Sequence, residues 1–176
     1  MKDEPALLRA ARKLNQDALI TIFDRYASAI YKYVLRFCHD PVESDRLVGE
    51  VFTELLGKFS GGQGPQKNLR LFLYQIAYPL VKSRINPTEH CSQSEVIIGL
   101  PTGASVHTPL EDPVFIEALL AALQGDLSED QRHVIILRFL EDFSLHETAA
   151  ILGKDPEDVR LIEKRGITEL RKCLGL

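Results

Sequence analysis

The hydrophobic positions of the chain fall into two blocks with a helical period, residues 5–84 and 113–174. Within the first block, apolar residues recur at three- and four-residue steps over 19–37, which places them on one face of a helix. Similar spacing predicts further helices around residues 47–56 and 69–81. Almost no alternating strand pattern is found, so we expect an all-α chain.

Turn and cap residues divide the first block into its helices. Asp40 and Pro41 are placed to end the first helix and to cap and open the second. The glycine-rich run 61–65 predicts a loop before the third helix. Pro79 lies inside the third pattern, where it removes a backbone hydrogen bond and predicts a kink.

The second block opens with a helical pattern over 114–123. Residues 128–131 (Ser-Glu-Asp-Gln) then have the form of a capping box, with an apolar helix after it. A short helix is expected at 145–152, closed by Gly153, and a last helix runs from Pro156 to about Cys173.

Between the blocks, glycine, proline and short polar residues are too frequent for a helix, although residues 96–98 have the composition of a short extended or docking segment. We therefore predict two small helical domains, residues 1–85 and 113–176. A flexible linker at 86–112 joins them.

Composition and charge narrow the classes of function. The 176 residues carry a formal net charge of −4, which suits a protein that docks on another protein and leaves DNA binding to a local basic face. No apolar run approaches the roughly 20 residues of a membrane span, and the N-terminus lacks a secretory signal. We therefore expect a soluble cytoplasmic protein. The three cysteines form no CxxC pair, so we expect reduced thiols and no metal site.

The layout from Ser144 to Arg165 is the most informative pattern. A short helix, a tight turn at Gly153 and a second helix form a helix-turn-helix, whose second helix can lie in the major groove of DNA. Ala149 and Ala150 are small where the helices would cross. An ordinary antiparallel helix pair is the alternative reading of this pattern.

The surrounding residues resemble a known family. The stretch 127–144 (LSEDQRHVIILRFLEDFS) is similar to the opening of region four of the extracytoplasmic-function group of bacterial RNA polymerase sigma factors. Residues 146–153 (HETAAILG) resemble the next helix of that region. Val159, Arg165 and the pair at 170–171 fall where its final helix has them.

The first block resembles region two of the same family. Residues 18–34 are similar to its start, and the stretch from Asp40 to Phe52 is similar to its polymerase-docking helix. Arg70 and residues 72–77 resemble the helix that handles the melted promoter strand. The two resemblances occur in family order along the chain.

The resemblance implies a promoter-specificity factor with core RNA polymerase, promoter DNA and an anti-sigma factor as partners, and without a cofactor. It implies polymerase binding by Asp45, Arg46 and Glu50. It also implies DNA binding by basic and aromatic side chains of both blocks. These are Arg160, Lys164, Arg165 and Lys154 in region four, and Arg70, Tyr74, Lys82 and Arg84 in region two.

Departures from the family pattern leave a second hypothesis open. Glu157 and Asp158 place two carboxylates at the start of the final helix. They could interact favourably with the helix dipole or repel the DNA phosphates, and Asp158 could instead accept a hydrogen bond from the amino group of cytosine. A degenerate protein that binds polymerase or an anti-sigma factor without reading promoters is therefore the alternative. The other departures are Gly49, Arg46, Phe72, Pro79, Ser83, Asn86 and Ile162.

An enzyme has little support in the sequence. The five histidines form no ligand-spaced pair, and the glycine cluster at 61–64 is not followed by the Lys-Ser or Lys-Thr of a phosphate-binding loop.

Overall fold

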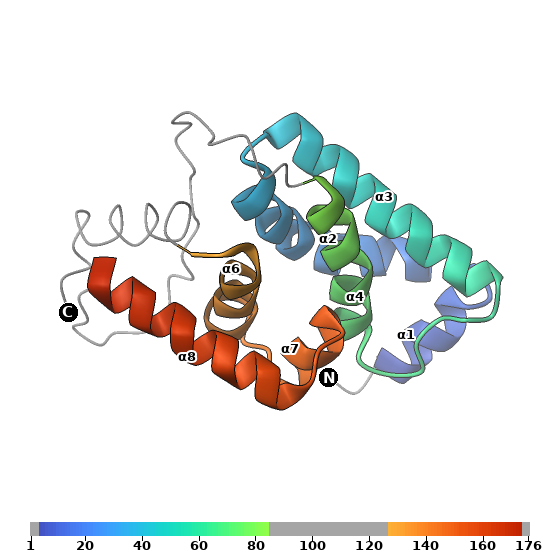
Figure 1. The fold of residues 1–176 in the computed structure, drawn as a ribbon. Helices are drawn as coiled ribbons and strands as arrows, with labels where there is room; N and C mark the ends of the chain where they lie inside the picture. Colours follow the sequence, from blue (N-terminus) through green and yellow to red (C-terminus); the bar gives the residue numbers. More distant parts are fainter. Residues whose placement is uncertain (1–3, 85–126, 174–176) are drawn as a thin grey trace, which may run out of the picture. The chain divides into compact units, whose positions relative to one another are not determined.

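The computed structural model describes residues 4–84 and 127–173, and every regular element in these ranges is helical (Figure 1). The all-α prediction is confirmed. The chain divides between Ile98 and Gly99 into two compact units. That point falls within the predicted linker, but 86–112 and the helix expected at 114–123 lie outside the described residues. The domain limits therefore stay a prediction.

Residues 4–84 of the first unit form four helices, of which α2, α3 and α4 pack against one another in pairs while α1 packs on α2 (Figure 1). The rings of Tyr33 and Tyr74 lie 5.1 Å apart at the centre of this bundle, and Phe37 lies 5.3 Å from Tyr33. The helices are α1 (Glu4–Ala11), α2 (Gln16–Cys38), α3 (Pro41–Ser60) and α4 (Leu69–Arg84).

The α2–α3 corner forms as its sequence predicts. His39 adopts a left-handed conformation with φ 54°, and its N–H donates to the carbonyl of Leu35, which ends α2. The Asp40 carboxylate then accepts hydrogen bonds from the backbone N–H groups of Val42 at 2.8 Å and Glu43 at 3.3 Å. These bonds satisfy donors that would otherwise be unpaired in the first turn of α3.

Helix α1 holds the loop that leads into α4. The Glu4 carboxylate accepts a hydrogen bond of 2.9 Å from the Leu69 N–H at the start of α4. The Arg12 guanidinium donates to the carbonyls of Gly64, at 3.1 Å, and Pro65. Nothing in the local sequence pattern indicates these contacts, because they join residues more than fifty positions apart.

Helix α4 continues through Pro79 to Arg84, so the proline does not end the helix. Its ring lies on the exposed side of α4. There the pyrrolidine displaces no core side chain.

The second unit has α8 packed against both α6 and α7 (Figure 1). The predicted capping box is present, since Gln131 accepts from the Ser128 N–H at 2.8 Å and Ser128 accepts from the Gln131 N–H. The helix then widens into a π-helical turn that the sequence did not indicate. The elements are α6 (Glu129–Ile135), η2 (Ile136–Leu140), α7 (Leu145–Leu152) and α8 (Pro156–Cys173). Across residues 4–84 and 127–173, no helix is both long and apolar enough to cross a membrane.

Candidate functional surfaces

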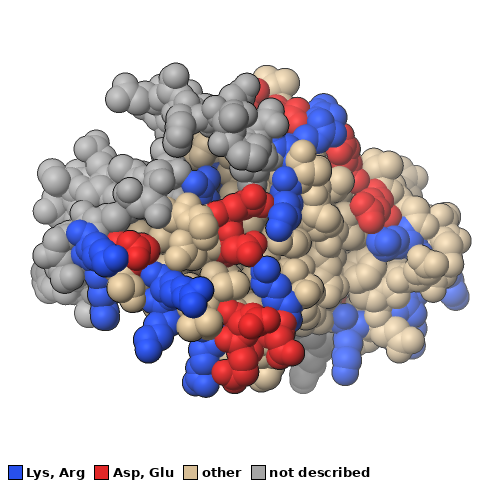
Figure 2. All heavy atoms as spheres, viewed as in Figure 1, with Lys and Arg blue, Asp and Glu red and all other residues tan. Residues whose placement is uncertain are grey.

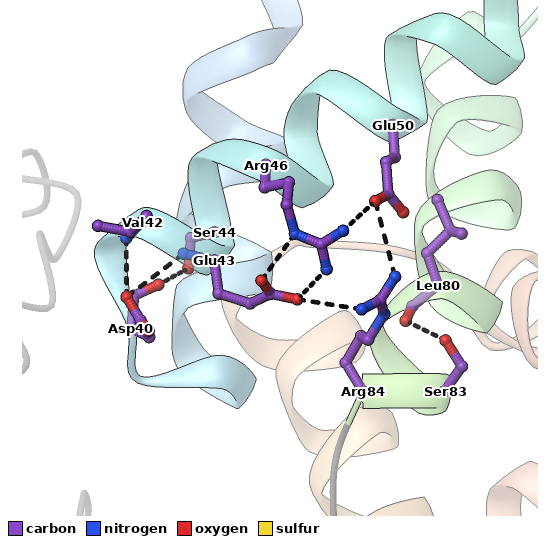
Figure 3. A network of polar contacts seen from close by, with 9 residues as sticks. All are labelled: Asp40, Val42, Glu43, Ser44, Arg46, Glu50, Leu80, Ser83 and Arg84. Atoms are coloured by element: carbon purple, nitrogen blue, oxygen red, sulfur yellow. Dashed lines mark hydrogen bonds and ion pairs between the residues drawn. The ribbon is translucent and has the colours of Figure 1, made fainter.

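The predicted docking residues on α3 belong to a network of four charges (Figure 3). The Arg46 guanidinium donates from Nε to Glu43 at 2.8 Å and from Nη1 to Glu50 at 2.6 Å. Arg84, the last residue of α4, lies 3.6 Å from each of the same two carboxylates. Two acids and two bases thus neutralise one another and join α3 to the end of α4.

The electrostatics of the network extend to its neighbours. The hydrogen bond from Arg46 lowers the pKa of the Glu43 carboxyl, and the same bond raises the pKa of Arg46. The Cys38 thiol has its pKa raised to about 11, chiefly by burial and then by the carboxylates of Glu43 and Asp40. Cys38 is therefore a protonated, weakly nucleophilic thiol at neutral pH.

Asp45 stands apart from this network. It is exposed on α3 and forms no ion pair with the residues described in the first unit. Glu50 follows it by five positions, which is about 140° around a helix. Asp45 and Glu50 therefore lie on different sides of α3, whereas Arg46 and Glu50, four residues apart, share one face. The sequence analysis missed Glu43, although its position three residues before Arg46 is an ion-pair spacing.

On α4, the structure contradicts the prediction that Tyr74 contacts the melted strand. Tyr74 is only 1% exposed and packs on Tyr33, so its ring offers no face on which a base can stack. Tyr74 lies on the side of α4 that faces the core. The sequence alone did not show whether this position is in the core or at the surface. Tyr78 is also buried, with the Lys82 ammonium 5.7 Å from its ring centre.

The basic candidates of α4 differ in their surroundings. The Arg70 guanidinium lies 5.7 Å from the Tyr74 ring centre, and the Arg70 side chain is half-buried. Lys82 is exposed and donates a hydrogen bond of 3.3 Å to the Tyr78 hydroxyl. Arg84 is exposed but bound in the α3 network. The exposed side of α4 thus carries cationic side chains, and no aromatic ring on this helix is fully exposed for stacking on a base.

In the second unit, α7 and α8 form the predicted helix-turn-helix. Ser144 caps α7 reciprocally with Glu147, and Gly153 closes it at φ 63°, where a side chain would be strained. Ala149 is buried at the helix crossing as predicted, whereas Ala150 is exposed.

Arg138 holds this motif together from η2. Its Nη1 donates to the Phe143 carbonyl at 2.6 Å, and its Nε donates to the Glu163 carboxylate on α8 at 3.3 Å. Both side chains are largely shielded from solvent, with Arg138 27% and Glu163 16% exposed. We call these contacts of Arg138 with Glu163 and Phe143 the lock. The lock links the loop before α7 to the middle of α8, and the sequence analysis did not identify it.

An open groove of about 720 Å³ runs along α8 beside this lock. Figure 2 shows Lys and Arg side chains gathered along α8, with acidic side chains where the helix begins. The groove therefore presents mainly cations, because its one carboxylate is paired with Arg138. Its lining residues are Arg138, Leu145, Arg160, Glu163, Lys164, Ile167, Thr168 and Arg171.

The four predicted DNA-binding cations of this unit are not equivalent. Lys164 and Arg165 are exposed, and neither forms an ion pair with the residues described at 127–173. Arg160 is exposed and lies 3.9 Å from Glu157 in the first turn. Lys154 is held 2.9 Å from Asp130 of α6, so its charge is already matched within the unit.

Comparisons with known proteins agree with this architecture. Residues 125–172 match the family model of sigma-70, region 4, which covers the helix-turn-helix. The chain is 25% identical over 181 residues to the ECF RNA polymerase sigma factor SigK of Mycobacterium sp. (strain KMS), covering 99% of this chain and 92% of that protein. It is 25% identical over 165 residues to the ECF RNA polymerase sigma factor SigX of Bacillus subtilis (strain 168), covering 88% and 82%.

Two solved structures share the fold. CnrH, in complex with the cytosolic domain of CnrY, superposes with a TM-score of 0.73 at 20% identity, covering 98% of this chain and 97% of that one. The sigma factor RpoE of Bartonella quintana, in complex with the anti-sigma factor NepR, gives 0.63 at 21% identity, covering 89% and 96%.

The helix-turn-helix and its family match define a sigma factor, a class of non-enzymatic transcription factors. The relatives that extend over both units narrow the class further. The chain is a sigma factor of the extracytoplasmic-function type, as its sequence predicted, and its function is that of an alternative sigma factor in transcription initiation.

Proposed function

We propose that this chain binds core RNA polymerase through α3 and directs it to promoters through α4 and α8. The observation that carries the proposal is the match of region 4 to a helix-turn-helix whose second helix exposes cations that form no ion pair with residues 127–173. The polymerase performs nucleotidyl transfer, and this chain supplies specificity and strand capture without chemistry of its own. Because the polymerase works on chromosomal DNA, we place this action in the cytoplasm.

On α3, we propose that Asp45 is the group most available to a partner. Arg46 and Glu50 are engaged with Glu43 and Arg84, so a partner must compete with those ion pairs to use them. Asp45 carries no such competitor among residues 4–84. Charge reversal at Glu50 would disturb the internal network, so Asp45 gives the cleaner test.

The docking test compares Asp45→Lys with Glu54→Lys in capture of core RNA polymerase by the full-length chain. Asp45→Lys should weaken capture about tenfold, because it places a like charge against a basic partner surface. Glu54→Lys, which breaks only the exposed pair with Lys58 at 3.4 Å, should leave capture unchanged. Circular dichroism checks that both variants keep their helices. Equal capture by both variants would remove α3 at Asp45 from the proposal.

The promoter-reading test uses run-off transcription and binding by the reconstituted holoenzyme on genomic fragments. Arg165→Ala should cost about 1–3 kcal/mol at one base position if its guanidinium reads a base. If it contacts only phosphate, the loss should be uniform and the salt slope should fall by about one unit. Asp158→Thr should raise affinity broadly if the carboxylate only repels phosphate, and should relax preference at one base if it reads cytosine.

One outcome would favour the degenerate alternative. If none of these substitutions changes DNA binding and the wild-type holoenzyme initiates nowhere above the background of core polymerase, the chain binds polymerase without reading promoters.

We further propose an anti-sigma factor as the regulatory partner, since CnrH and RpoE have the same fold and RpoE is bound to the anti-sigma factor NepR.

We also keep the division into 1–85, 86–112 and 113–176. Limited proteolysis should cut first at 86–112, where glycine and proline are frequent. Preferential cleavage inside either helical block would contradict that division.

A further inference from the structure

Leu161 is an exposed leucine at the centre of a charged helix face. Its side chain is 47% exposed on α8, although Val159, two residues earlier, is completely buried. A single exposed leucine is common on protein surfaces and needs no function by itself. Its position on α8 is what calls for an explanation.

Helix geometry places Leu161 on the midline of the exposed face of α8. Each residue turns the helix by about 100°, so Leu161 and Thr168 lie within about 20° of one line. Lys164 and Arg165 flank that line by about 60° and 40° on opposite sides. All four side chains are exposed, and the opposite side of the helix is buried against the unit.

This arrangement determines what each residue meets if α8 enters the major groove. Cations at the flanks of such a helix reach the phosphates of the two strands, whereas the midline faces the base edges on the groove floor. Leucine neither donates nor accepts a hydrogen bond. The apolar group that base pairs present in the major groove is the C5 methyl of thymine.

We propose that Leu161 is a specificity-determining residue that packs against a thymine methyl group in the upstream promoter element. The proposal rests on the proposed function, since it requires α8 to enter the major groove. It assigns preference for thymine at one or two positions to an apolar contact. Lys164 and Arg165 then supply attraction, and Leu161 supplies discrimination.

The test removes the methyl group alone. The holoenzyme, made from the full chain and core RNA polymerase, first selects its preferred sites from randomised duplexes. Each thymine of a selected site is then replaced singly by deoxyuridine, which keeps base pairing and lacks the C5 methyl. We expect the affinity of the wild-type holoenzyme to fall about fourfold at one or two positions, the equivalent of one buried methylene group.

Variants assign that loss to the leucine. Leu161→Ser should abolish the thymine–uracil difference at the same positions, whereas Leu161→Met, which stays apolar, should retain it. Leu14→Ser, at a 50% exposed leucine outside α3, α4 and α8, is the matched control and should also retain it.

The outcomes separate this inference from the proposed function. If the holoenzyme selects no sequence at all, the proposed function fails. If it selects sites and yet no deoxyuridine lowers affinity, or if Leu161→Ser keeps the difference, the inference about Leu161 is wrong. Reduced capture of core polymerase by Leu161→Ser with unchanged discrimination would assign the leucine to a protein contact instead.

Discussion

The lock between Arg138 and Glu163 should carry a large share of the stability of the second unit. Arg138→Met keeps the length of the side chain and removes its hydrogen bonds to Glu163 and to the Phe143 carbonyl. Hydrogen bonds to charged groups contribute about 1.5–3 kcal/mol each, and the shielded Glu163 carboxylate loses its partner. We expect a loss of about 3 kcal/mol, which is a substantial fraction of the free energy of unfolding of a small domain.

Hydrogen exchange measured by mass spectrometry is the suitable assay, because both units are helical and circular dichroism does not separate them. Peptides from α7 and α8 should open more easily in Arg138→Met, while peptides from α2–α4 should not change. In a double-mutant cycle with Glu163→Gln, the combined loss should fall short of the sum by about 1–2 kcal/mol, since the double variant leaves no shielded charge without its counter-charge.

Arg165→Met is the matched control, since Arg165 forms no ion pair within 127–173. It should change the opening free energy by less than about 0.5 kcal/mol. An equal, small effect of Arg138→Met and Arg165→Met would refute the reasoning, as would strictly additive losses in the cycle.

Three further predictions concern the first unit. In chemical denaturation, Gly64→Ala should lower the free energy of unfolding by about 1–3 kcal/mol, because its Cβ would lie 2.3 Å from the Phe59 ring. Gly49→Ala should raise the free energy of unfolding by about 0.5–1 kcal/mol, because the added Cβ would have no atom within 4 Å. The lowered pKa of Glu43 contributes stability above its unfolded value of 4.5, so the stability advantage of wild type over Glu43→Gln should disappear as pH falls through the folded pKa. With its pKa near 11, Cys38 should be about a thousandth thiolate at pH 8, and peptide mapping should show slow alkylation that accelerates towards pH 11.

The starts of α3, α6 and α7 could be predicted because they depend on nearby residues, whereas α1 and the π-helical turn were not predicted. Asp40 caps α3, and Ser128 and Gln131 form the expected capping box at the start of α6. Gly153 closes α7 in a conformation that favours glycine. These contacts span two to four residues, so the local sequence contains both partners. The family resemblance, carried by motifs in chain order, was confirmed for the same reason.

The function of individual side chains depended on packing between distant segments. The sequence did not decide whether Tyr74 lies in the core or at the surface, and only the packing of α2 on α4 buries its ring against Tyr33. Arg84 reaches Glu43 and Glu50 across forty-one and thirty-four positions, which turns a predicted docking face into a neutralised network.

The sequence by itself determined that this chain is helical, where α3, α6 and α7 begin, and which family it resembles, because hydrophobic period, caps and motifs are local properties. The tertiary structure alone decided which charges are already paired and which aromatic rings are buried. It also showed that Leu161 stays exposed while its neighbour Val159 is covered. Burial and ion pairing depend on which surfaces the helices press together, and that is a property of the packed unit.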